Sequence, residues 1–276
     1  MVFTCTLTCL SGTQSQRLFT WNSVQQHYSA LPLPPYPFKP CCSSSSRNHN
    51  HTFSLIQDCA VIACLRANRQ LLFTLLLSLY LACSAEQAME AARAAVNGGI
   101  EVLEIVRSTP GVFEVLQALV KEYPTKAFGV GTVLNAEDAK TAMNAGAKFL
   151  MSPATVKDIM DDVQDADVLY MPGVMTPTEI FSAYNSGAKI VKIYPVSALG
   201  GTRYISAIMK PFPHIPMVAS QGITIDSVGD YIAQGAISVV LSDAIFDKEA
   251  MGRNNFNAIH QLAKSAALQG KIAVEW

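Results

Sequence analysis

One lysine lies in an unusual setting for a charged residue. Lys192 interrupts Ile190–Tyr194, a stretch of β-branched and aromatic residues that predicts a buried strand. Alternation along a strand places Lys192 on the same face as the residues two positions away, so we expect its side chain to face inward. Burial disfavours an ammonium and favours the neutral amine, which is the form that attacks a ketone. The alternative is a structural lysine that is paired with a carboxylate.

A single carboxylate occupies a comparable place in another predicted strand. Glu104 is the only charged residue in the second half of the apolar run Ile100–Val106. A carboxylate in apolar surroundings is suited to moving protons, and histidine is scarce beyond residue 51. Glu104 is therefore the predicted acid/base group, with a plain ion pair to Lys192 or Arg66 as the alternative.

The elements that would position these groups alternate regularly along the chain. Short apolar, β-branched runs are separated by amphipathic stretches, which is typical of parallel strands joined by crossover helices. We expect an α/β fold, a (β/α)8 TIM barrel with an irregular N-terminal extension. The strands are predicted at Ala60–Arg66, Ile100–Val106, Ala127–Gly131, Lys148–Met151, Asp167–Met171, Ile190–Tyr194, Pro216–Ala219 and Ile237–Leu241.

Two helix starts are marked by their local sequence. Thr176-Pro177-Thr178-Glu179 has a capping hydroxyl, a first-turn proline and an acid three residues after the cap. Thr109-Pro110 predicts a similar start after the second strand.

The active site of such a barrel lies at the carboxyl ends of its strands, so the residues there are candidate substrate ligands. Arg66 ends the first strand and offers a guanidinium fork suited to a carboxylate, unless it is a surface arginine. Thr132 and Ser242 offer hydroxyl groups, and Ser220-Gln221-Gly222 offers backbone N–H groups where barrels often bind phosphate. The low glycine content of this segment makes it only a weak indication of a phosphate-binding site. No residue cluster has metal-ligand spacing, so we expect neither a metal nor a cofactor.

Composition limits the kinds of partner. Hydrophobic residues make up 50% of the 276 residues and charged residues 15%, which is enough for a large core. The net charge of −1 comes without a basic stripe, so a small molecule is a more plausible partner than nucleic acid. All seven cysteines lie in the first 83 residues without a disulfide framework, which favours a reducing compartment.

Residues 1–57 differ in composition from the rest. They contain no Asp or Glu and are rich in Ser, Thr and Pro. Such a segment is typical of an organelle transit peptide, which would direct the protein to the plastid (chloroplast). The alternative is an N-terminal extension without a targeting function, on a cytoplasmic protein. The barrel domain is then expected over residues 58–276.

An apolar run, Leu71–Ala82, interrupts the regular pattern as part of an insertion over residues 69–83. It is too short to span a bilayer, which needs roughly 20 residues, so no membrane partner is expected. It could be an extra helix over the barrel mouth, a membrane-surface anchor, or an insertion foreign to the working protein. We favour the last, because joining Asn68 to Ser84 would give an ordinary strand–loop–helix unit.

Several motifs, in order over residues 60–270, resemble the 2-dehydro-3-deoxy-phosphogluconate / 4-hydroxy-2-oxoglutarate aldolase family, and plant members in particular. They are Leu65-Arg66-Ala67-Asn68, Leu103-Glu104-Ile105, Gly129-Val130-Gly131-Thr132-Val133-Leu134, Met151-Ser152-Pro153, Met171-Pro172-Gly173-Val174-Met175-Thr176-Pro177-Thr178-Glu179 and Lys192-Ile193-Tyr194-Pro195.

The resemblance implies a class I, metal-independent aldolase that reversibly cleaves a 2-oxo acid to pyruvate and an aldehyde. It implies that Lys192 is the Schiff-base lysine and Glu104 the acid/base. Arg66, Thr132 and Pro153 would line the pyruvate end of the pocket, and family members are typically homotrimers. A non-catalytic barrel that binds a 2-oxo acid or a protein partner is the alternative.

The sequence departs from the family's pattern at the end of the pocket that holds phosphate in its members. Ser220-Gln221-Gly222 stands where well-known members have Thr-Gly-Gly, and Leu241 replaces a glycine. We expect the glutamine and the leucine to crowd a phosphate group, which disfavours phosphogluconate as the substrate. Ser108 stands where some members carry an arginine, and the neighbouring Arg107 is expected to point to the opposite face.

Overall fold

A computed structural model describes residues 47–67, 85–164 and 166–275. All of them belong to one of the two compact units of the chain, which begins at Ser45. Every strand pairing in this unit is parallel. The strands are β1 (Val61–Leu65), β2 (Val102–Val106), β3 (Ala127–Gly131), β4 (Phe149–Met151), β5 (Leu169–Met171), β6 (Gly173–Val174), β7 (Val191–Ile193), β8 (Met217–Ser220) and β9 (Ser238–Leu241).

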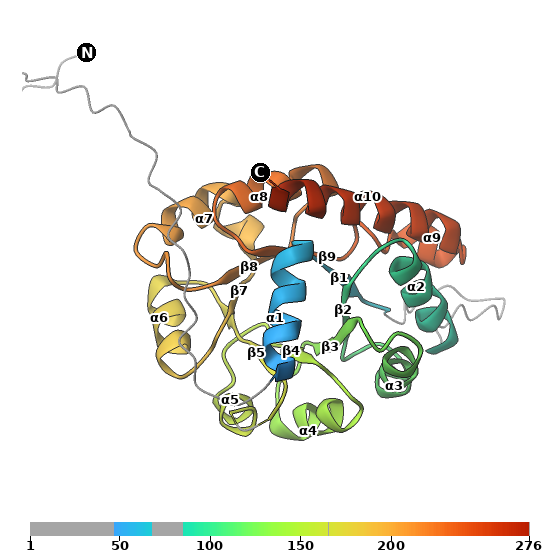
Figure 1. Cartoon of the computed structure of the whole chain (residues 1–276), viewed down its shortest axis with the longest axis horizontal. Helices are drawn as coiled ribbons and strands as arrows, with labels where there is room; N and C mark the ends of the chain where they lie inside the picture. Colours follow the sequence, from blue (N-terminus) through green and yellow to red (C-terminus); the bar gives the residue numbers. More distant parts are fainter. Residues whose placement is uncertain (1–46, 68–84, 165, 276) are drawn as a thin grey trace, which may run out of the picture. The chain divides into compact units, whose positions relative to one another are not determined.

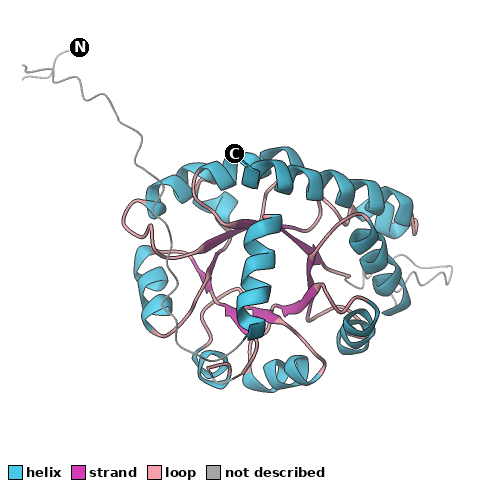
Figure 2. Cartoon of the chain, viewed as in Figure 1, coloured by secondary structure: helices cyan, strands magenta, loops and turns pink. Residues whose placement is uncertain are grey.

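The strands form a closed ring. Their order is β5-β4-β3-β2-β1-β9-β8-β7-β6, and the two outermost members, β5 and β6, are consecutive pieces separated only by Pro172. Pro172 lacks an N–H donor, but its carbonyl accepts from the Lys192 N–H at 2.9 Å. β5 pairs with β4 and β6 pairs with β7, so one interrupted strand closes an eight-stranded barrel (Figure 2). The predicted (β/α)8 fold is confirmed.

Helices surround the ring of strands, as Figure 1 shows. Each crossover returns the chain to the amino-terminal end of the next parallel strand. The helices are α1 (Arg47–Cys59), α2 (Ala85–Asn97), α3 (Val112–Glu122), α4 (Ala136–Asn144), α5 (Lys157–Asp162), α6 (Pro177–Asn185), η1 (Val196–Leu199), α7 (Thr202–Met209), η2 (Ile225–Ser227), α8 (Val228–Ala233), α9 (Lys248–Gly252) and α10 (Phe256–Glu275).

The apolar side chains form two layers, as strand alternation requires. The larger cluster fills the space between the barrel and its helices. The smaller cluster fills the barrel interior and draws on alternate strand residues, among them Ile62, Val102, Phe149 and Val218. Glu104 and Lys192 follow the same alternation as the interior set, so both side chains enter the barrel.

The expectation of an irregular segment over residues 1–57 is wrong for its last part. Residues 47–59 form α1, and within it Thr52 and Ile56 are buried. Ile56 joins the interior cluster, and α1 contacts β1, β2, β5 and β9. Since α1 leads directly into β1, it covers the amino-terminal end of the barrel and crosses the ring in Figure 1. The sequence did not predict this helix, because its apolar positions lie within a segment that is polar overall.

The fifth strand and the start of α3 differ from the prediction. The fifth strand begins at Leu169, two residues after the predicted start, and continues beyond Pro172. Thr109 does not cap α3, whose cap is Gly111; instead the Thr109 hydroxyl accepts from the Ala67 N–H at 3.3 Å. The predicted start at Thr176 is confirmed, because Thr176 and Glu179 form a reciprocal capping box.

The apolar run Leu71–Ala82 and residues 1–46 lie outside the described residues. Among the helices that are described, none combines the length and apolar character needed to cross a membrane.

We expect Ile56→Ala to destabilise the barrel. The substitution leaves a cavity where α1 meets the fully enclosed interior cluster, and such truncations cost about 2–5 kcal/mol. Urea unfolding measures the loss, with Ser54→Ala on the exposed face of α1 as the control. Equal unfolding midpoints for the two variants would show that α1 contributes nothing to the fold.

Candidate active site

Lys192 and Glu104 meet inside the barrel. Lys192 lies in the middle of β7 and Glu104 in the middle of β2, and both are buried. The Nζ atom of Lys192 is 3.6 Å from Oε1 of Glu104 and 5.5 Å from the centre of the Tyr194 ring. Two oppositely charged groups are thus held together where water is largely excluded. The ion pair anticipated as the structural alternative is present, and it places an amine beside a carboxylate, a type of group that can transfer protons.

Gly131 makes room for the carboxylate. A Cβ atom at this position would lie 1.6 Å from Oε1 of Glu104 and 2.4 Å from its Cδ. The end of β3 must therefore lack a side chain for Glu104 to reach Lys192. Sequence reasoning missed this requirement, although the glycine stands in a strand that is otherwise apolar.

A hydrogen-bonded chain fixes the loop that carries Pro153. The Tyr170 hydroxyl donates to Ser152 Oγ at 2.9 Å, and Ser152 donates to the carbonyl of Val133 at 2.6 Å. Tyr170 also accepts from the Val156 N–H at 3.1 Å. Burial raises the pKa of Tyr170, so its hydroxyl keeps the proton that it donates. The loops after β3 and β4 are thereby tied to each other.

Thr132 and Arg66 lie at the same end of the barrel as these loops. Thr132 follows β3 with a φ of 60°, a left-handed conformation that non-glycine residues rarely adopt. Arg66 follows β1 and is exposed, and none of the ion pairs among the described residues involves it. A guanidinium at this end of the barrel is suited to binding a carboxylate.

The loops after β8 and β9 form another part of this rim. Ser220 ends β8 and is buried, Gly222 is exposed with a φ of 74°, and Ser242 follows β9 and is half-buried. Gln221 has a φ of 85°, and its side-chain oxygen accepts a hydrogen bond from the Ser197 hydroxyl. A Cβ atom on Gly222 would lie 2.4 Å from that of Ser197. Ser197 therefore covers the loop from the neighbouring strand end, a contact that the sequence did not predict.

Leu241 does not crowd this rim, contrary to expectation. Its side chain is fully buried in the outer apolar layer, between the barrel and the helices. Of the two residues that depart from the family's pattern, Gln221 and Leu241, only Gln221 faces the open end of the barrel. Arg107 does point away from the interior, as expected, since it pairs with Asp138 at 2.8 Å and lies over the Phe113 ring.

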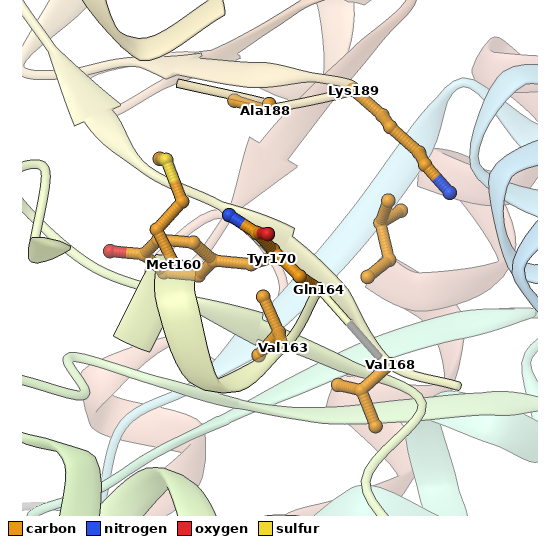
Figure 3. A pocket seen from close by; sticks show the side chains of 9 residues that line it. Met160, Val163, Gln164, Val168, Tyr170, Ala188 and Lys189 are labelled. Atoms are coloured by element: carbon orange, nitrogen blue, oxygen red, sulfur yellow. The ribbon is translucent and has the colours of Figure 1, made fainter. Parts of the chain in front are cut away.

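A separate hollow lies at the opposite end of the strands (Figure 3). It measures about 270 Å³ and is lined by residues in and after α5, before and in β5, and in the turn before β7, including Val163, Gln164, Val168 and Lys189. Barrel chemistry is found at the carboxyl ends, and this hollow faces the amino-terminal ends. Within the described part of the chain, no group of His, Cys, Asp or Glu is arranged to hold a metal ion.

The fold and the site define a closed parallel barrel with a lysine–carboxylate pair in its interior. A sequence model described as KDPG and KHG aldolase matches residues 73–262. This match covers more than half of the chain, which therefore belongs to the KDPG and KHG aldolase family and is an aldolase, a carbon–carbon lyase of class I. The match begins after β1, so it does not include Arg66.

Curated relatives and solved structures are consistent with this family. The chain is 28% identical to the KHG/KDPG aldolase of Escherichia coli K12 over 187 residues, or 68% of this chain and 88% of that protein. It is 29% identical over 179 residues to the 2-dehydro-3-deoxy-phosphogluconate aldolase of Treponema pallidum, covering 65% and 85% of the two chains.

The KDPG aldolase of Legionella pneumophila has been solved with pyruvate captured as a covalent carbinolamine intermediate. Its fold matches with a TM-score of 0.67 at 23% identity, over 80% of this chain and 98% of that one.

We expect Gly131→Ala to disable the site while the barrel still folds. The added methyl group would displace the Glu104 carboxylate from Lys192, and a small misplacement of a catalytic group costs about 100-fold in rate. Pyruvate release measures the effect, and circular dichroism checks the fold. Gly229→Ala is the matched control, because its Cβ would meet nothing within 4 Å. Full activity of Gly131→Ala would contradict the close packing of Glu104 on this glycine.

Proposed function

We propose that Lys192 is the residue that forms a Schiff base with the substrate of this aldolase. The observation that carries the proposal is the position of its Nζ atom, buried in the barrel and 3.6 Å from the Glu104 carboxylate. The carbinolamine of pyruvate in the Legionella pneumophila relative supports the same chemistry here. An amine that is held out of water beside a base can lose its proton and attack a carbonyl carbon.

The reaction runs through a series of intermediates that are covalently bound to Lys192. Neutral Lys192 adds to the 2-oxo carbon, and the carbinolamine loses water to give an iminium ion, with Glu104 donating the proton that leaves with oxygen. Glu104, now a carboxylate, removes the proton of the 4-hydroxyl group, and the C3–C4 bond breaks. The bonding pair passes to the iminium as an enamine, and the aldehyde departs. Protonation of C3 and hydrolysis of the imine release pyruvate and free Lys192.

Arg66, Thr132 and Pro153 are proposed to hold the pyruvate end of the substrate. The guanidinium of Arg66 suits the carboxylate, and the loops of Thr132 and Pro153 are joined through Ser152 and Tyr170. Ser220, Gly222 and Ser242 are proposed to line the aldehyde end, because they follow the strands on the other side of Lys192. No cofactor takes part in this scheme.

Of the two acids for which the family is named, we propose the unphosphorylated 4-hydroxy-2-oxoglutarate as the substrate. Gln221 lies in the loop after β8 and Ser197 of η1 covers it, where an open, glycine-rich backbone would cradle a phosphate. The Gln221 carbonyl is engaged by Ser197, which leaves its amide N–H groups as donors for a smaller carboxylate.

The protein is further proposed to be a homotrimer located in the plastid. Exposed apolar side chains on and before α6, namely Met175, Phe181 and Tyr184, support contact between copies. Light scattering would return the mass of three chains, whereas a monomer would contradict this assembly. The acid-free composition of residues 1–46, which precede α1, supports plastid import, which a fluorescent fusion of this segment tests in leaf cells.

We expect Lys192→Met to abolish pyruvate release from 4-hydroxy-2-oxoglutarate. Loss of the nucleophile should lower kcat by about 1,000-fold or more, because no other amine lies in the barrel interior among the described residues. A coupled assay with lactate dehydrogenase measures pyruvate. Lys189→Met is the matched control, since this exposed lysine precedes the same strand at its other end. Comparable loss in both variants, or activity in Lys192→Met, would refute the assignment.

We expect Gln221→Gly to improve the use of the phosphorylated acid. Removal of the side chain opens the loop after β8, and kcat/KM for 2-dehydro-3-deoxy-6-phosphogluconate should rise about tenfold relative to 4-hydroxy-2-oxoglutarate. The same pyruvate assay reports both substrates. If the parent strongly preferred the phosphorylated acid and Gln221→Gly kept the same ratio of kcat/KM for the two acids, Gln221 would have no part in substrate selection.

A further inference from the structure

Cys64 lies beside the catalytic pair but has no part in the mechanism above. It belongs to β1, where its Cα atom is the ladder partner of that of Glu104 on β2. Both residues share the interior face of the barrel, and the exposed fractions of Cys64 and Glu104 are 6% and 1%. Side chains at paired positions of neighbouring strands are in contact range.

The carboxylate of Glu104 has unmet hydrogen-bonding capacity. Oε1 faces Lys192, but the buried Oε2 has no hydrogen-bond partner in the described part of the protein. A buried carboxylate oxygen without a donor is unfavourable, and most such oxygens in proteins are satisfied. On its β3 side Glu104 meets the backbone of Gly131, which offers no side chain. The Cys64 thiol, on the β1 side, is a neighbouring group that can donate.

The thiol of Cys64 retains its proton. Its pKa lies well above the ordinary value, first because of burial and then because of the negative charge of Glu104, to which it can hydrogen bond. Lys192 and Arg66 are the cations that face this thiol, and both oppose that rise. At neutral pH the group is therefore a weak S–H donor and a poor nucleophile.

We propose that Cys64 is a positioning residue whose S–H group donates to the Glu104 carboxylate, stabilises its charged form and turns it toward Lys192. The inference rests on the acid/base role proposed for Glu104. It also distinguishes Cys64 from the other members of the apolar interior cluster, which have no proposed part in proton transfer. The consequence is a change in the pH dependence of proton transfer when the donor is removed, at unchanged fold.

Three substitutions distinguish donation from packing. Cys64→Ala removes the donor and some volume, Cys64→Val removes the donor but fills the space, and Cys64→Ser keeps a donor that is stronger than a thiol. Without a donor the carboxylate is protonated more easily, so base activity is lost at a higher pH. The pH at the midpoint of the acid limb of the rate profile should therefore be lowest in Cys64→Ser and higher in the parent. It should be highest, and equal, in Cys64→Ala and Cys64→Val.

The readout is the exchange of pyruvate methyl protons for solvent deuterium, followed by proton NMR across pH. This exchange requires the imine at Lys192 and an acid/base group but no aldehyde, so it does not depend on the identity of the second product. We expect the midpoint of the acid limb to rise by about half a unit to one unit in Cys64→Ala and Cys64→Val, the size of one net hydrogen bond. Cys64→Ser should not show this rise.

Two results would overturn the inference. Identical midpoints in all four proteins would make Cys64 a packing residue, as would a Ser variant that behaves like Ala. Absence of exchange in the folded parent would instead refute the proposed function, so the two failures are distinguishable. A second measurement is independent of turnover: the S–H stretching band of Cys64, isolated as the Raman difference between parent and Cys64→Ser, should move to higher frequency in Glu104→Ala. An unmoved band would also contradict donation.

Discussion

The structure depends on holding an ammonium and a carboxylate together inside an apolar barrel. Each charge loses several kcal/mol of hydration when it is buried, and mutual attraction recovers this only at close range and with further hydrogen bonds. Lys192 and Glu104 are 3.6 Å apart, which meets the first condition. The second condition is met incompletely, because Oε2 of Glu104 has no hydrogen-bond partner among the described residues. A pair of this kind is a weak stabiliser and a good proton-transfer device.

Several features of the fold serve this pair. Parallel closure brings β2 and β7 to opposite sides of the same interior, and Pro172 interrupts the fifth strand without breaking the ring. Gly131 leaves the space that the carboxylate needs. At the other end of the barrel, α1 inserts Ile56 into the interior cluster and closes it against water. The barrel interior that holds the ion pair is therefore accessible from one end only.

The barrel and its central pair could be predicted because both follow from period-two alternation. A lysine and a glutamate that interrupt apolar strands must face inward when the outer face is covered by helices. Side-chain contacts between distant segments could not be predicted in the same way. The Ser197–Gln221 contact and the fit of Glu104 over Gly131 depend on loop paths and rotamers that no local pattern specifies. Leu241 was misjudged because strand position alone did not show which layer it enters.

The most direct test of the central claim is to trap the intermediate. The full chain is incubated with pyruvate and sodium borohydride, and peptide mass mapping locates the reduced adduct. The account predicts one pyruvate per chain, on Lys192, and none in Lys192→Met. An adduct on another lysine, or a folded protein that traps no pyruvate, would contradict it and leave the barrel as a binding protein for 2-oxo acids.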